Sequence, residues 1–274
     1  MRLGAGLLLA ALGAAAAPAA AETRPLWEFG MGAAALRMPH YRGSDQADNW
    51  LLPVPYLVYR GNILRADRDG ARAVLLDTER LDFDFSVGAS APTRSRDNTA
   101  RQGMPDLAPT VEFGPKLNLN LARGADWKVD LRVPVRAVMT LESKPRHIGW
   151  SATPVLNLDL ATRLVDLGMQ AGPLWGDRRL HAYYYDVAPA FATTARPAYR
   201  AGAGRAGWQL TLGASRRIGQ FWLGAFVRAD SVAGAAFEPS PLVRSRHQLA
   251  FGAAVSWIFA ASGDTVDVPP ERGR

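Results

Sequence analysis

Gln248 to Phe259, which reads QLAFGAAVSWIF, is the stretch that decides the fold of this chain. Large apolar side chains alternate with small or polar ones along it, and Ile258 is the exception. Successive side chains of a strand point to opposite faces, so the stretch predicts a strand with one apolar face and one small, polar face. Crossing a bilayer at a tilt takes about 9–11 residues, whereas strands of soluble sheets mostly have about 5–6. We therefore expect a membrane-spanning strand, whose partners the rest of the chain must supply.

The composition agrees with this interpretation and excludes several other classes of protein. The 274 residues include 32 Lys and Arg, 25 Asp and Glu, and no Cys. The lack of Cys excludes disulfides, thiolate metal ligands and a Cys nucleophile. Beyond the N-terminus there is no run of the roughly 20 apolar residues that a spanning helix needs, whereas barrel strands escape such a search because only alternate residues are apolar.

The N-terminus has the features of a secretory signal peptide. Arg2 precedes an apolar run over residues 3–17, and small residues follow Pro18. We predict a signal peptide over residues 1–21, a barrel over residues 22–259 and a solvated polar tail over residues 260–274. Cleavage after Ala21 removes Arg2 and no acid, so 31 bases and 25 acids leave a net charge of +6. Export together with long alternating strands predicts the outer membrane of a Gram-negative bacterium as the location.

The same alternation recurs along the chain, with connections that are short and long in turn. Bacterial outer-membrane barrels have short periplasmic turns and longer outer loops, so this order is typical of them. The predicted fold class is all-β, a transmembrane antiparallel β-barrel of about 12 strands, with 10 or 14 as alternatives. In the second strand the apolar phase is Leu52, Val54, Tyr56 and Val58, and two prolines lie on the other phase. The further strands are expected at residues 27–35, 52–58, 63–67, 71–76, 81–89, 111–121, 127–137, 150–160, 165–175, 208–214 and 221–227.

A soluble β-sandwich or lipocalin-like barrel would also alternate, but its apolar face would point inward. Three features favour lipid on the outside: the strands are long, the charged phase is rich in Gly and Asn, and tryptophans mark strand ends as interfacial girdles do. The charged phase carries both signs, so we expect ion pairs across a small or plugged lumen. The tryptophans in question are Trp27, Trp127, Trp150, Trp175, Trp208 and Trp257.

The long connections carry the whole charge excess of the mature chain. Residues 37–49, 91–108, 140–149, 176–207 and 232–246 contain fourteen bases and eight acids, which again gives +6. Arg forks suit phosphate groups. We therefore predict contacts of Arg94, Arg96 and Arg101 with outer-leaflet lipid, that is lipopolysaccharide, and a merely solvated basic surface is the alternative.

No sequence motif indicates catalysis, a cofactor or a metal. The chain has no Gly-x-Ser-x-Gly elbow and no His-Glu-x-x-His pair. Ser44 and Asp45 lie close to His40, and Ser240 lies near His247, but neighbours in sequence do not make a triad because the geometry must come from the fold. We expect no enzymatic activity, no cofactor and no bound metal.

Several stretches resemble the MipA/OmpV family, the MltA-interacting outer-membrane proteins, and they follow in order over essentially the whole mature chain. They are Tyr41 to Ser44, Leu52 to Tyr56, Gly103 to Pro115, Tyr183 to Val187, Arg196 to Tyr199 and Ser240 to Val243. The Gly43-Ser44, Pro105-Asp106 and Pro197–Tyr199 stretches are expected to order loops over the barrel mouth. Asp186 and the tail over residues 260–274 depart from the family pattern. Family positions without an assigned role are Tyr41, Gly43, Ser44, Pro105, Asp106, Tyr184, Pro197, Tyr199, Ser240 and Pro241.

The resemblance implies an outer-membrane barrel that acts as a scaffold between a lytic transglycosylase and a peptidoglycan synthase. A small-solute porin or channel and a surface adhesin are the alternatives, and an outer-membrane lipid-modifying enzyme is the third. No nucleic-acid partner is expected.

Overall fold

The computed structural model describes residues 22–61, 64–67, 70–77 and 80–268. The predicted signal peptide over residues 1–21 and the end of the predicted tail over residues 269–274 lie outside them. Nearly all of the regular secondary structure in the described chain is antiparallel strand, which confirms the predicted fold class. No helix in the described ranges is long and apolar enough to cross a membrane.

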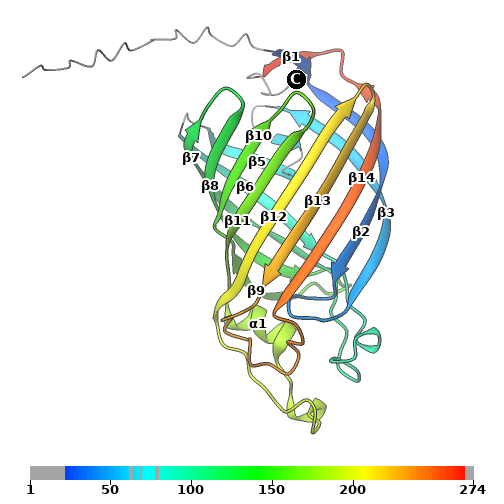
Figure 1. Cartoon of the computed structure of the whole chain (residues 1–274), viewed down its shortest axis with the longest axis vertical. Coiled ribbons are helices and arrows are strands. Elements are labelled where there is room, and N and C mark those ends of the chain that lie inside the picture. Colours follow the sequence, from blue (N-terminus) through cyan, green and yellow to red (C-terminus); the bar gives the residue numbers. More distant parts are fainter. Residues whose placement is uncertain (1–21, 62–63, 68–69, 78–79, 269–274) are drawn as a thin grey trace, which may run out of the picture.

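One sheet of thirteen described strands closes on itself into a barrel (Figure 1). β9 and β10 follow one another along a single path, because both pair with β8 and with β11, so the described strands fill twelve positions around the barrel. The strands are β2 (Trp27–Pro39), β3 (Ala47–Arg60), β4 (Leu64–Asp67), β5 (Gly70–Asp77), β6 (Leu81–Ser90), β7 (Thr110–Arg123), β8 (Trp127–Thr140), β9 (His147–Ala152), β10 (Val155–Ala161), β11 (Asp166–Gly176), β12 (Gly204–Ile218), β13 (Phe221–Ser231) and β14 (His247–Ala261).

The last long strand closes the barrel against the first. β14 pairs with β2 over ten residue pairs, from Phe251 opposite Arg37 to Ala261 opposite Glu28. The two backbones approach so closely that a Cβ at Gly30 or Gly32 would collide with carbonyl groups of β14. Glycine at these two positions therefore allows the closing contact.

Apolar side chains cover the outside of the barrel and charged ones lie inside. The six tryptophans expected at strand ends are between 38% and 50% exposed. By contrast, the strand carboxylates Glu28, Asp84, Asp130 and Asp230 are at most 3% exposed. A soluble barrel would show the opposite distribution, so the apolar surface is the one that faces lipid.

β3 faces the other way from the expectation. Leu51 and Leu57 point outward and are 78% and 54% exposed, whereas the Tyr56 ring lies inside, 6.0 Å from that of Trp222. Both phases of this strand are apolar, so alternation alone could not orient it. Pro53 and Pro55 lie on the same phase as these two leucines and therefore also point outward.

The two prolines of β3 lie where a missing N–H costs little. The Arg60 N–H donates to the Leu26 carbonyl on the β2 side, so the odd-numbered backbone groups of β3 point away from β2. On the side away from β2, β4 pairs only with Tyr59 and Arg60. No described strand pairs with residues 51–57 on that side. Proline is tolerated on such an edge because no ladder donor is needed there.

All long connections lie at one end of the barrel, drawn at the bottom of Figure 1, and the short turns lie at the other. They contain α1 (Arg178–Tyr185) and two short 3-10 turns, η1 (Ser95–Asp97) and η2 (Pro189–Phe191). The Asp177 side chain caps α1 by accepting a hydrogen bond from the Leu180 N–H.

The two ends of the described chain form a separate two-stranded sheet at the short-turn end (Figure 1). β1 (Glu22–Pro25) pairs with β15 (Thr265–Val268), with Glu22 opposite Val268. The expected boundary after residue 259 and the solvated tail therefore need correction, since β14 continues to Ala261 and residues 265–268 are paired. We call this sheet the terminal ribbon.

Deletion of residues 262–274 should leave a barrel that still folds but is less stable. The closing β14–β2 pairs remain, while the terminal ribbon is lost, so we expect a melting temperature lower by about 2–8 °C for a cost of about 1–2 kcal/mol. The heat-dependent shift in gel migration of a folded barrel, together with thermal unfolding, measures this. Deletion of residues 269–274 alone is the control, and a longer deletion that gives no folded barrel would make the ribbon part of the folding signal.

Candidate functional site

The long loops pack on one another over the barrel mouth and form an apolar core there. We call residues 40–46, 91–109, 177–203 and 232–246 the loop cap. At its centre the rings of Tyr185 and Phe237 stack with centroids 3.6 Å apart and an angle of 6°. The buried cluster consists of Tyr41, Leu107, Tyr185, Val187, Ala201, Val232, Ala235, Phe237 and Leu242. Apolar burial in this protein is thus concentrated in the cap, because the strands expose their apolar face to lipid.

The family positions named from the sequence all lie in the loop cap. The Tyr41 hydroxyl donates to the Leu242 carbonyl at 2.9 Å, and burial raises its pKa to about 12, so it remains a donor at neutral pH. The Ser240 hydroxyl donates to the Tyr185 carbonyl at 2.8 Å. Gly43 adopts a φ of 94°, and its carbonyl accepts from the Arg244 N–H at 2.7 Å. These residues join loops that are distant in sequence.

Other family positions make contacts within single loops. Asp106 accepts from the Ser95 N–H at 2.6 Å, and the Pro105 carbonyl accepts from the Ser95 hydroxyl at 2.7 Å. Tyr199 pairs through its backbone with Val187. Pro197 and Pro241 adjoin these contacts in the chain. The sequence motifs therefore correspond to hydrogen bonds that order each loop and join different loops.

Arg101 is not a lipid contact, and the prediction for this residue is wrong. It is 2% exposed, and its guanidinium donates to the Tyr184 carbonyl at 2.9 Å and the Pro105 carbonyl at 3.1 Å. The Arg101 guanidinium donates to backbone carbonyl groups that loop packing would otherwise leave without partners, and not to the lipid phosphate that we expected. Arg94 and Arg96, by contrast, are exposed at the rim of the cap.

His40 and Ser44 do come together, but not as a catalytic pair. His40 Nε2 lies 3.2 Å from Asp48 Oδ1, and the Asn98 amide donates both to His40 Nδ1 and to Ser44 Oγ at 3.0 Å. The Ser44 hydroxyl donates to the Gln46 carbonyl and is 2% exposed. A nucleophile needs a hydrogen bond to its base and access to substrate. This network has neither, and it fastens residues 40–46 to residues 91–109.

Ion pairs line the lumen below the cap, as expected from the charged phase. Glu28 joins its own strand to Arg217 of β12, three strands away around the barrel, so the interior is bridged and not only lined. Arg42 reaches from the cap to Asp230 in the wall. The pairs, with N–O distances of 2.5 to 4.0 Å, are Glu28 with Arg60 and Arg217, Asp84 with Lys116, Asp130 with Lys128 and Arg132, Asp159 with Arg132, Glu112 with Arg136, and Asp230 with Arg42 and Arg228.

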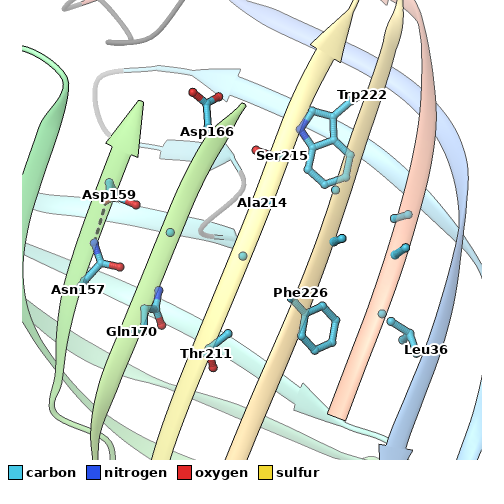
Figure 2. A pocket seen from close by; sticks show the side chains of 17 residues that line it. Leu36, Asn157, Asp159, Asp166, Gln170, Thr211, Ala214, Ser215, Trp222 and Phe226 are labelled. Carbon is cyan, nitrogen blue, oxygen red and sulfur yellow. Dashed lines mark hydrogen bonds between the residues drawn. The ribbon is translucent and has the colours of Figure 1, made fainter. Parts of the chain in front are cut away.

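A cavity of about 320 Å³ remains against the wall formed by β10 to β14 (Figure 2). Its polar lining comes from β10, β11 and β12, and its aromatic lining comes from Trp222 and Phe226 of β13. Sequence reasoning missed this site, although glycines on the small, polar phase of β11, β12 and β13, namely Gly168, Gly213 and Gly224, were the available signal.

His181 is a buried titratable group that packs against the core of the loop cap. Its Nδ1–H donates to the Gly202 carbonyl at 2.7 Å, while Nε2 has no hydrogen-bond partner among the described residues. Its ring meets that of Phe237 edge-on at 4.9 Å and that of Tyr185 at 6.4 Å. Burial lowers the pKa of His181, and the Gly202 carbonyl and Asp177 oppose this only in part.

Comparison with known proteins places most of the chain in one family. The family model described as MltA-interacting protein MipA matches residues 31–259. No curated protein sequence matches the chain.

Among solved structures, the β domain of the Bordetella autotransporter BrkA has a TM-score of 0.43 and 11% identity, and covers 85% of this chain and 100% of that one. An outer-membrane channel from Pseudomonas putida has a TM-score of 0.40 and 13% identity, and covers 92% and 100%. The Ralstonia pickettii toluene transporter TbuX has a TM-score of 0.27 and 8% identity, and covers 87% and 70%. Likenesses this loose say nothing about function.

Acidification should loosen the loop cap through His181. Above about pH 6.5 the imidazole is neutral in both the folded and the unfolded cap, whereas below it the unfolded cap takes up the proton more readily, so stability falls as the pH drops toward the lowered pKa of the folded state. Limited proteolysis of residues 187–200 should be severalfold faster at about pH 5.5 than at about pH 7.5. The ratio of the two proteolysis rates should approach one in His181→Phe. An unchanged ratio in that variant would assign the effect to another group. His40→Gln, which removes a different loop histidine, is the control and should keep the wild-type ratio.

Proposed function

The chain belongs to the family of MltA-interacting protein MipA, and we propose that it is a closed outer-membrane β-barrel that holds a cell-wall enzyme at its periplasmic face. The observation that carries this proposal is the sealed mouth. A barrel that passes solutes freely needs an open path, and here the loop cap has a buried aromatic core fastened by hydrogen bonds between loops. Below it, ion pairs bridge the lumen.

The periplasmic face offers a feature through which a partner can bind. The long loops are assigned to the outer side, so the terminal ribbon lies in the periplasm. A two-stranded sheet leaves backbone donors and acceptors on both outer edges, and proteins recognise such edges by adding a strand. The family description supports the lytic transglycosylase MltA as the partner, and the sequence resemblance adds a peptidoglycan synthase. The proposed role includes no catalysis.

Passage of small solutes is the second candidate function, and the lumen cavity is the observation that favours it. A cavity of about 320 Å³ is large enough for a small organic molecule. Transport would also require the loop cap to move, because the cap closes the outer mouth.

We also propose that Arg94 and Arg96 contact phosphate groups of outer-leaflet lipopolysaccharide. Both are exposed at the cap rim, and Arg96 is 74% exposed in its side chain with only an i,i+1 contact to Asp97 at 3.7 Å. Guanidinium forks bind phosphate well. A pair this exposed competes weakly with a phosphate partner.

Replacement of the rim arginines and of Arg101 should have opposite consequences. Arg94→Ala with Arg96→Ala should weaken binding of lipopolysaccharide and flatten its salt dependence, with stability changed by no more than about 0.5 kcal/mol. Arg101→Ala should destabilise the cap by about 2–3 kcal/mol because buried carbonyls lose a charged donor. Lipid co-purification and thermal unfolding measure the two effects. Unaltered lipid binding in the double variant would leave the rim as a merely solvated surface.

Electrical recording and partner capture together test the scaffold proposal. The purified barrel in a planar bilayer should be silent, and Phe237→Ala should produce conductance because it removes the centre of the cap core, at a cost of about 3–5 kcal/mol. The silent wild-type barrel should capture the transglycosylase. Capture should weaken on deletion of residues 262–274. Steady ion-selective steps from the wild-type barrel, without capture, would favour the channel.

A further inference from the structure

The lumen cavity has two chemically different sides, which lie about two strand spacings apart along the same wall. Asp166 lies opposite Ser215, and Ser215 lies opposite Gly224, over which the Trp222 ring extends. Neighbouring strands are about 4.8 Å apart, so a carboxylate, a hydroxyl and an indole follow one another over about 10 Å. Figure 2 shows the polar side chains on one side and Trp222 and Phe226 on the other.

Between these two sides the floor of the cavity is glycine. Gly168 and Gly213 lie directly opposite each other. A Cβ at Gly213 would approach only backbone atoms, at 3.9 and 4.0 Å, and one at Gly168 would approach only Asp159 Oδ1, at 3.7 Å. The space above this floor is therefore open and is not filled by neighbouring side chains.

A second set of glycines holds the aromatic side flat. A Cβ at Gly224 would collide with the Trp222 indole, and one at Gly252 would collide with Leu36 and approach the Phe226 ring. Both rings therefore lie along the barrel wall and present an apolar surface to the cavity. The Tyr56 ring, whose centroid is 6.0 Å from that of Trp222, supports the indole from β3.

The polar side of the cavity offers hydrogen bonds and a negative field that nearby bases reduce. Asp159 accepts from Asn157 at 2.8 Å and from Arg132 at 3.2 Å. With Lys128 on Asp130, this cluster has two bases and two acids, and Asp166 in the cavity lining adds a third carboxylate. Gln170 and Thr211 lie opposite each other and line the same cavity, adding an amide and a hydroxyl.

We propose that this cavity binds a neutral saccharide of one or two rings. A sugar ring has an apolar C–H face, which suits the flat indole, and a rim of hydroxyl groups, which suits the planar amide and carboxylate groups opposite. The glycine floor gives the ring room, and a cavity of about 320 Å³ matches a disaccharide in size. The site goes beyond the proposed scaffold role, which requires no ligand.

Calorimetric titration of the full-length mature barrel in detergent with chitobiose and maltose tests the site. We expect saturable binding of at least one of them. Gly213→Leu should lower the affinity at least about tenfold by filling the open floor, and Trp222→Ala should do so by removing the apolar platform. Saturation-transfer NMR should place the sugar C–H groups against aromatic protons in the wild-type barrel.

Two matched controls separate loss of the site from loss of the fold. Ala33→Leu adds the same side chain on the lipid face of β2, away from the cavity lining, and Trp257→Ala removes a lipid-facing tryptophan. Both should bind sugar as the wild-type does, and all four variants should show the gel shift of a folded barrel. Absence of binding to the folded wild-type barrel at about 10 mM of either sugar would overturn the proposal. So would unaltered binding in Gly213→Leu, or tighter binding of benzylammonium, which would make the site one for cations.

Discussion

Hydrocarbon offers no hydrogen-bond partner to a peptide group, and every other feature of this barrel depends on that constraint. An open strand edge in lipid would leave a row of backbone donors and acceptors unsatisfied, each at a cost of several kcal/mol. The β14–β2 seam removes that edge, and the small residues of β2 let the two backbones meet. Where β3 leaves a partial edge, prolines reduce the number of donors that need partners.

A barrel closed in lipid reverses the usual distribution of side chains, with apolar ones on the outside and polar ones inside. Strands that expose apolar side chains to the bilayer cannot also bury them, so the lumen receives the polar phase and must neutralise it with ion pairs. The apolar core is then built from the loops, where tyrosines and Phe237 pack away from water. The same packing that orders the loops holds them over the mouth, so the position of the loop cap is a consequence of where the core can be.

The sequence correctly predicted the features that depend on the alternation of apolar and polar residues. It failed where that alternation carries no information. Period-two patterns placed the strands and the lipid face, because burial in lipid acts on every second residue. β3 was oriented the wrong way because Leu51 and Leu57 make its second phase as apolar as its first. Arg101 was misplaced because a loop arginine looks the same in sequence whether it binds phosphate or buried carbonyls. The resemblance marked residues of the loop cap without revealing that they meet. The lumen cavity depends on which glycines face each other, which only strand register shows.

The terminal ribbon brings the first and last described residues to the same place, with Glu22 opposite Val268. The barrel wall is already continuous through β14 and β2, so the finished polypeptide has the connectivity of a ring with one cut in it. Nothing in the pairing of the strands marks that cut as special. The completed architecture is thus indifferent to where along the ring the two ends lie.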